Sequence, residues 1–220
     1  TEATGRGVYF GVREACNDKE DMKNLGLEPG IEGKTFVVQG LGNVGYHAAK
    51  YLTEAGARMI GVAEYEGSIY DKKGMDLDKL MEYRKDTGSI VGFGNSEEME
   101  DRGAVLEAEC DILVPAALEN QINSDNMENI QAKIIAEAAN GPTTTEAHHF
   151  LKQRGALLIP DNYLNAGGVT VSYFEWLKNL SHVRFGRMEK RAEVTSYRKI
   201  LKVIENISDR TFTENELESL

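Results

Sequence analysis

The most constraining feature of the sequence is a glycine-rich segment, Gly40-Leu-Gly-Asn-Val-Gly45, which lies between an apolar run and a helical pattern. The run before it, residues 34–39, has the length and composition of a short buried strand. The residues after it have helical spacing up to a turn at Gly56. In a G-x-G-x-x-G turn the glycines allow a tight bend, close approach of a ligand to the backbone, and close helix–strand packing. The segment therefore predicts the first β-α unit of an α/β fold.

An acidic residue completes this pattern. A second apolar run, residues 58–63, is followed directly by Glu64, nineteen residues after Gly45. In dinucleotide-binding units an acidic residue at this spacing accepts hydrogen bonds from the adenosine ribose, and the helix N-terminus binds the pyrophosphate. Ordinary turn glycines and a surface carboxylate are the alternative interpretation. Because strand, turn, helix and acid all stand in the required order, the pattern favours a dinucleotide site.

Strand and helix signals alternate along the rest of the chain, as in α/β proteins. Strands apolar on both faces are typical of a parallel sheet covered on two sides, so we expect a Rossmann-like, doubly wound, mostly parallel sheet with helices on both faces. Residues 187–220 are charged, lack glycine and have helical spacing, and we expect them to form a helical extension to a domain spanning residues 1–186. Phe174 and Trp176 are expected in the core. The further expected helices are 4–23, 76–84, 144–154 and 168–176, and the further expected strands are 111–114, 133–136 and 156–159.

Composition narrows the classes of partner. The net charge of −11 repels phosphate backbones, so we expect no nucleic-acid partner. No apolar run reaches the roughly 20 residues that span a bilayer, so we expect no membrane insertion. Cys16 and Cys110 lack metal-ligand spacing, and adjacent His148 and His149 lack a ligand partner, so no metal site is expected. Two reduced thiols indicate a reducing compartment, the cytoplasm or alternatively the mitochondrial matrix.

Several segments resemble the glutamate dehydrogenase family of glutamate, leucine, phenylalanine and valine dehydrogenases. The two longest are residues 138–143, Ala-Ala-Asn-Gly-Pro-Thr, and residues 160–176, which contain Asn165-Ala-Gly-Gly168. Both follow candidate strand ends, where α/β proteins bind ligands. Residues 4–8, 39–45 and 110–117 fit the same family in the same order. The resemblance covers nearly all of residues 1–186 and is to the C-terminal NAD(P)-binding domain of these enzymes.

The resemblance implies roles for individual residues. Thr4 and Asn140 would hydrogen-bond the nicotinamide carboxamide or its ribose, and Asn165 would lie beside substrate and nicotinamide. Ser172 would donate a hydrogen bond to the distal carboxylate of glutamate. The implied cofactor-binding residues are Thr4, Gly40, Gly42, Asn43, Val44, Gly45, Glu64, Ala116, Asn140 and Asn165. The implied substrate-binding residues are Gly168, Val169 and Ser172.

The resemblance also implies that a substrate domain absent from this chain supplies the catalytic lysine and aspartate. No catalytic residue is therefore assigned here, and the 220 residues alone are expected to be inactive. The complete enzyme would be a homohexamer that converts L-glutamate to 2-oxoglutarate and ammonia. Glu64 and Glu66 would oppose a 2′-phosphate, and no arginine follows them closely in sequence, so NAD is expected over NADP, although NADP use is possible.

Two alternatives stay open. A leucine- or phenylalanine-type dehydrogenase would share the glycine motif and the Asn-Ala-Gly-Gly segment, but Ser172-Tyr-Phe-Glu-Trp176 resembles the glutamate branch. A non-catalytic NAD-sensing module would share the glycine motif alone. Such a module does not need motifs around Asn140 and Asn165, and their presence argues against it.

Overall fold

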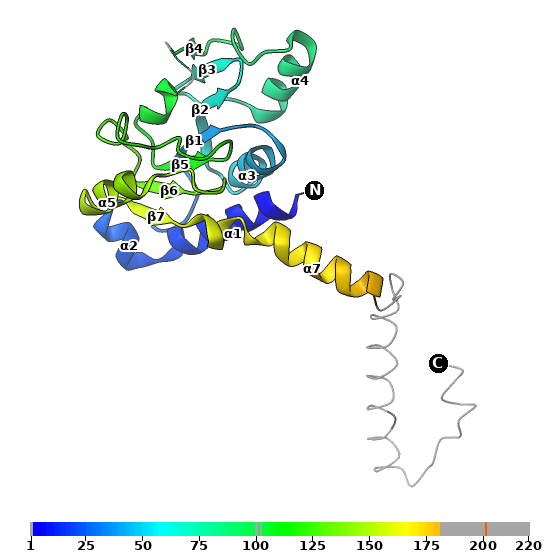
Figure 1. Cartoon of the computed structure of the whole chain (residues 1–220). Helices are drawn as coiled ribbons and strands as arrows, with labels where there is room; N and C mark the ends of the chain where they lie inside the picture. The colour runs from blue at the N-terminus through cyan, green and yellow to red at the C-terminus, as the bar shows by residue number, and fades with distance from the viewer. Residues whose placement is uncertain (1, 100, 102, 181–200, 202–220) are drawn as a thin grey trace. The chain divides into compact units, whose positions relative to one another are not determined.

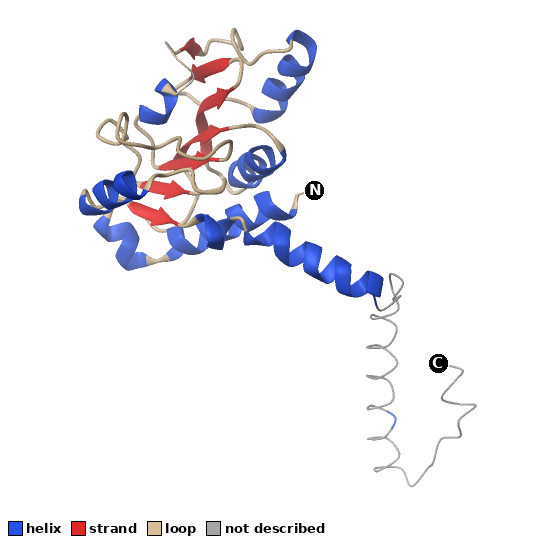
Figure 2. Cartoon of the chain, viewed as in Figure 1, coloured by secondary structure: helices blue, strands red, loops and turns tan. Residues whose placement is uncertain are grey.

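The computed structural model describes residues 2–99, 101, 103–180 and 201, and the chain divides into two compact units, Thr1–Val171 and Ser172–Leu220. The first unit contains the sheet and the helices packed on it (Figures 1 and 2). The predicted boundary at residues 186–187 lies outside the described residues, as does all of the predicted extension except residue 201. Both stay predictions.

Within the described residues the sheet has seven strands in the order β4-β3-β2-β1-β5-β6-β7. From β2 through β1 and β5 to β7 all neighbours are parallel, whereas β3 pairs antiparallel with β2 and with β4. The mostly parallel sheet is therefore confirmed.

The strands are β1 (Thr35–Gln39), β2 (Arg58–Glu64), β3 (Gly67–Tyr70), β4 (Glu97–Glu98), β5 (Ile112–Pro115), β6 (Ile134–Ala136) and β7 (Leu157–Ile159). The helices are α1 (Ala3–Asn17), α2 (Lys19–Asn24), α3 (Asn43–Glu54), α4 (Leu77–Thr87), the 3-10 helix η1 (Ala104–Glu107), α5 (Thr145–Gln153), α6 (Asp161–Leu164) and α7 (Ala166–Leu180).

Two hydrophobic cores lie on opposite faces of the sheet, because successive strand residues point to opposite sides. In β1, Phe36 and Val38 face one core and Val37 faces the other. The first core is covered by α1, α3 and α4, and the second by η1 and α5 (Figure 1). This arrangement confirms the expected helices on both faces. It also leaves the carboxyl ends of the parallel strands β1 and β5 adjacent, at the point where the order of the strands in the sheet reverses.

The expectation of one leading helix over residues 4–23 is wrong. Asp18 has an extended backbone, and its carboxylate accepts hydrogen bonds from the Glu20 and Asp21 N–H groups. It is an N-cap residue, so it ends α1 and begins α2. Aspartate competes with helical hydrogen bonding in this way, and the apolar spacing of α1 continued past it without revealing the break.

A hairpin was missed between β2 and β3. The residues Tyr65 and Glu66 form its turn, and Glu64 pairs with Gly67 across it. β3 has only four residues, too few for a reliable alternation of apolar and polar side chains. The short α6 was missed for the same reason, since a single turn carries no periodicity.

The core positions expected on α7 are wrong. The Phe174 and Trp176 side chains are 63% and 54% exposed. The helical spacing of their segment identified α7 as a helix, but spacing alone does not say what covers its apolar face. Among the described residues, no helix is both long and apolar enough to cross a membrane.

Both cysteines are buried and free. Burial raises the pKa of Cys16 to about 11 and the pKa of Cys110 to about 12. Because the thiolate is the reactive form, we expect native protein at pH 8 to react with a thiol reagent much more slowly than urea-unfolded protein. Equal modification rates in the two states would contradict this.

The same shifts give a direction for stability against pH. A raised folded-state pKa means that the thiol form is favoured in the native state, so this contribution is intact below the unfolded cysteine pKa of about 8.5. It is lost as pH rises from there toward the folded values of about 11 and about 12. In denaturant titrations above pH 8.5, we therefore expect the free energy of unfolding to fall more steeply with pH for wild type than for Cys110→Ala. The same pH dependence in both proteins would contradict this assignment.

Candidate cofactor-binding site

The turn between β1 and α3 begins at Gly40, which has a positive φ of 87°. Its N–H donates to the Ala63 carbonyl oxygen at 2.7 Å, which ties the turn to the end of β2. A side chain here would be strained, and an added Cβ would lie 3.0 Å from the Ala117 Cβ. The first glycine of the motif therefore allows the bend that the sequence predicted.

The other two glycines of the motif have different surroundings. A Cβ added to Gly45 would overlap the Gly40 carbonyl oxygen, so this position needs glycine for α3 to pack against the turn. A Cβ added to Gly42 would have no atom of the described residues within 4 Å, its chain neighbours aside. Gly42 is the N-cap of α3 and provides no side-chain cap. The N–H groups of the first turn, from Asn43 and Val44 onward, therefore lie at an open helix N-terminus, which suits a pyrophosphate.

Glu64 lies at the end of β2 beside this turn. Its carboxylate accepts a hydrogen bond from the Leu41 N–H, inside the glycine motif. Its side chain is 12% exposed. It also lines a cavity of about 410 Å³, formed by Gln39, Gly40, Ala63, Glu64, Tyr65, Ala117, Leu118 and Gln121. The predicted acid and the glycine turn therefore border one cavity at the carboxyl ends of the strands.

Gln39 is a residue of this cavity that the sequence did not single out. It is 8% exposed, and its Nε2 donates to Gln121 Oε1 at 2.7 Å. Its Oε1 is buried and has no hydrogen-bond partner among the described residues. A buried unpaired acceptor is costly unless a donor reaches it. Gln39 therefore adds a buried, unpaired acceptor to the wall of the cavity, and the glycine turn with Glu64 fits a nucleotide.

A second group of residues lies after β6 and β7. The Asn165 Nδ2 donates to Asn140 Oδ1 at 2.6 Å, so the two asparagines predicted from separate motifs are in contact. Asp161 accepts from the Gly141 N–H at 2.8 Å, and its own N–H donates to Glu137 at 3.2 Å. Glu137 and Asp161 thus hold the Asn140 loop in position. Only their proximity to the predicted motifs could have drawn attention to them.

The beginning of α1 joins the two groups. A Cβ added to Gly5 would lie 2.8 Å from the Val44 carbonyl oxygen in α3. A Cβ added to Gly168 would overlap the Thr4 hydroxyl. A Cβ on Gly167 would lie 2.5 Å from the Ala3 carbonyl oxygen. These glycines allow α1 to lie against both α3 and the beginning of α7, and they bring Thr4 beside Gly168.

The structure thus brings most of the predicted cofactor residues to one edge of the first unit. Ala116 follows β5 there, with its N–H donating to the Gln39 carbonyl oxygen at 2.8 Å. Val169 directly follows Gly168 and is 74% exposed. Ser172 belongs to the second unit and is exposed on α7. Its predicted place beside the substrate is not tested by these contacts.

Arg84, in the last turn of α4, contacts both Glu64 and Glu66, although no arginine follows them closely in sequence. The expectation that these two carboxylates act without an arginine is therefore wrong. Its Nη1 lies 3.0 Å from Glu64 Oε1, and its Nε lies 2.6 Å from Glu66 Oε1. Burial alone would lower the pKa of Arg84, but hydrogen bonds and charges from Glu66 and Glu64 raise it above its ordinary value. The two carboxylates are therefore partly neutralised.

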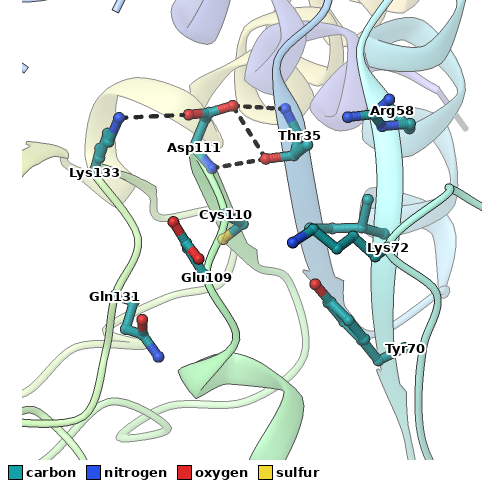
Figure 3. Close-up of a pocket in the computed structure, with 10 residues that line it drawn as sticks. Thr35, Arg58, Tyr70, Lys72, Glu109, Cys110, Asp111, Gln131 and Lys133 are labelled. Carbon is teal, nitrogen blue, oxygen red and sulfur yellow. Dashed lines mark hydrogen bonds and ion pairs between the residues drawn. The ribbon is translucent and has the colours of Figure 1, made fainter. Parts of the chain in front are cut away.

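A second cavity, of about 300 Å³, lies at the opposite edge of the sheet (Figure 3). The Asp111 carboxylate there accepts hydrogen bonds from the Thr35 N–H and hydroxyl, at 2.8 and 3.0 Å, and lies 3.9 Å from Lys133. These contacts join the amino ends of β1 and β5. Parallel α/β sheets bind cofactors at the carboxyl ends, so the cavity beside Glu64 is the better cofactor site.

The sequence is similar to those of glutamate dehydrogenases from other organisms. The chain is 51% identical over 216 residues to the mitochondrial glutamate dehydrogenase of Dictyostelium discoideum, covering 98% of this chain and 43% of that protein. It is 45% identical over 177 residues to a cryptic catabolic NAD-specific glutamate dehydrogenase of Bacillus subtilis, covering 80% of this chain and 39% of that protein. The chain thus spans less than half the length of these relatives.

Solved structures of amino-acid dehydrogenases are also similar to the chain. A hetero-hexameric glutamate dehydrogenase from Thermus thermophilus superposes with a TM-score of 0.71 at 30% identity, covering 87% of this chain and 43% of that one. An L-tryptophan dehydrogenase from Nostoc punctiforme superposes with a TM-score of 0.58 at 28% identity, covering 80% and 46%. The glutamate/leucine/phenylalanine/valine dehydrogenase family model matches residues 1–216. The chain therefore belongs to the glutamate/leucine/phenylalanine/valine dehydrogenase family.

Proposed function

We propose that this chain is the cofactor-binding part of a NAD-dependent glutamate dehydrogenase, which converts L-glutamate to 2-oxoglutarate and ammonia. The observation that carries the proposal is the open N-terminus of α3 at Gly42, beside the cavity that Glu64 lines. The names of the relatives support glutamate as substrate, and the name of the Bacillus protein supports NAD. NADP use stays possible, since Arg84 partly neutralises the carboxylates.

The residues of the first unit have separable roles in this proposal. Gly40, Gly42 and Gly45, with the Asn43 and Val44 N–H groups, hold the pyrophosphate at the helix N-terminus. Glu64 accepts hydrogen bonds from the adenosine ribose, and Ala116 borders the same turn. NAD bound there would supply the acceptor for the hydride that leaves the α-carbon of the amino acid.

At the nicotinamide end, Thr4 and Asn140 orient the carboxamide or its ribose. The hydrogen bond from Asn165 to Asn140, at 2.6 Å, limits the rotation of both side chains and so supports a defined ring orientation. Gly168 leaves room beside Thr4, which a side chain would fill. Val169 and Ser172 would contact the substrate side chain.

The groups that handle the amino group would lie outside these 220 residues, in the part of the relatives that this chain does not match. We propose a homohexamer for the complete enzyme. The family resemblance implies identical subunits, and the Thermus relative, which is a hetero-hexamer, supports the number of six. We propose the cytoplasm or the mitochondrial matrix as its compartment. Two buried free thiols support a reducing compartment, and the net charge of −11 argues against nucleic acid as a partner.

A binding and activity assay tests this proposal. We expect the purified 220-residue chain to bind NADH, measured by nicotinamide fluorescence, but more weakly than the complete protein, because no second domain closes over the nicotinamide. We expect it to produce no NADH from glutamate and NAD. The complete protein should produce NADH from glutamate in preference to leucine or phenylalanine. Glutamate-dependent NADH production by the chain alone, or absence of NADH binding, would contradict the proposal.

A further inference from the structure

Three charged side chains form a connected group beside the proposed adenosine site. The Arg84 guanidinium donates two hydrogen bonds to Glu66, from Nε at 2.6 Å and from Nη2 at 3.2 Å, and one to Glu64, from Nη1 at 3.0 Å. The side chains of Arg84, Glu64 and Glu66 are 25%, 12% and 16% exposed. A paired, two-pronged guanidinium–carboxylate contact of this kind is among the stronger and more directional polar contacts in proteins.

The position of this group bears on the choice of cofactor. Glu64 lines the cavity and accepts a hydrogen bond from the Leu41 N–H. Arg84 contacts this carboxylate, which is proposed to bind the ribose, but is not among the residues that line the cavity. In dinucleotide-binding folds an arginine near this point accommodates the 2′-phosphate of NADP. Here such an arginine is present, but two of its hydrogen bonds go to Glu66, which is not among the residues that line the cavity.

We propose that Glu66 is a second determinant of cofactor specificity, which acts by holding the Arg84 guanidinium against the β2–β3 turn and away from a 2′-phosphate. This rests on the proposed cofactor site and goes beyond it, because it assigns selectivity to a residue that does not touch the cofactor. The charges support this proposal. Arg84, Glu64 and Glu66 together carry one positive and two negative charges, so loss of the Glu66 charge brings their net charge to zero. Loss of Arg84 instead leaves two negative charges beside the phosphate.

The test compares the binding of NADH and NADPH by fluorescence titration of the 220-residue chain. We expect Glu66→Gln to raise the affinity for NADPH relative to NADH by roughly 10-fold, since the freed guanidinium gains a charge-assisted hydrogen bond to the phosphate. The double variant Glu66→Gln/Arg84→Met should lose this gain. Arg84→Met alone should move the ratio toward NADH. A change in stability alone would alter both affinities together and leave their ratio unchanged.

Lys79→Met is the matched control. Lys79 lies on the same helix, and its Nζ forms an exposed ion pair with Asp76 at 3.2 Å, so this variant removes a positive charge without altering the Glu64–Arg84–Glu66 group. Its NADPH-to-NADH ratio should equal that of wild type. An unchanged ratio in Glu66→Gln, or a gain that survives in the double variant, would overturn the inference. Failure of wild type to bind either nucleotide would instead refute the proposed cofactor site itself, and the inference with it.

Discussion

Replacing Gly45 with alanine is expected to destabilise the protein by about 3 kcal/mol or more, with near-complete loss of NADH binding. The added methyl group would overlap the Gly40 carbonyl oxygen, and it would also lie 2.9 Å from the Gly40 carbonyl carbon. Both atoms belong to backbone in a turn with a positive φ, so no side-chain rotation can relieve the contact. The beginning of α3 must therefore move, and with it the N–H groups that are proposed to bind the pyrophosphate. In enzymes, a misplacement of about 1 Å can lower the reaction rate roughly 100-fold.

Thermal unfolding and NADH fluorescence measure the two effects separately. A loss of 3 kcal/mol corresponds to a fall in melting temperature of roughly 6–12 °C for a chain of this size. The nearby Gly42→Ala is the matched control, since its added methyl group meets no atom within 4 Å and its φ of −73° suits alanine. We expect its stability to change by no more than about 1 kcal/mol.

The control also tests the ligand position. In Gly42→Ala the methyl group would stand at the open N-terminus of α3, where the pyrophosphate is proposed to bind, so NADH binding should weaken although the fold is intact. If Gly42→Ala binds NADH as wild type does, the phosphates do not approach the backbone at Gly42. If Gly45→Ala retains both stability and binding, the packing argument for this glycine is wrong.

Replacing Ser172 with alanine in the complete enzyme is expected to narrow its preference for glutamate over norvaline by roughly 10- to 100-fold in kcat/KM. Glutamate differs from norvaline by a distal carboxylate, which must leave water to bind. Each charge-assisted hydrogen bond recovers about 1.5–3 kcal/mol of that cost. The Ser172 hydroxyl is proposed to donate one such bond, while NAD affinity should hardly change because this hydroxyl is assigned to the substrate.

Thr170→Ala serves as the control for this measurement. Its hydroxyl donates to the Ala166 carbonyl oxygen at 2.9 Å, and two residues along a helix place it about 200° around the axis from Ser172. Removing it should leave the ratio of specificity constants as in wild type. An unchanged ratio in Ser172→Ala would show that this hydroxyl has no part in recognising the distal carboxylate.

The sequence by itself determined those features that depend on short segments of the chain. The glycine motif, the strand before it and the helix after it occupy residues 34–54, and backbone sterics and hydrogen bonding within that segment account for their geometry. Glu64 could be placed because a strand that follows a helix in a β-α-β unit returns at a nearly constant spacing. The α/β class followed from the alternation of short apolar strands with helices, which depends on side-chain periodicity alone.

Contacts between distant segments were decided only by the tertiary structure. Arg84 is 20 residues from Glu64, and Gln39 is 82 residues from Gln121, yet each pair is in hydrogen-bond contact. Thr4 meets Gly168 because α1 packs against the beginning of α7. Such pairs depend on strand order and on which helix faces meet, and periodicity does not encode either. The sequence therefore located the glycine turn, whereas only the folded chain placed an arginine beside the two carboxylates that are proposed to select the cofactor.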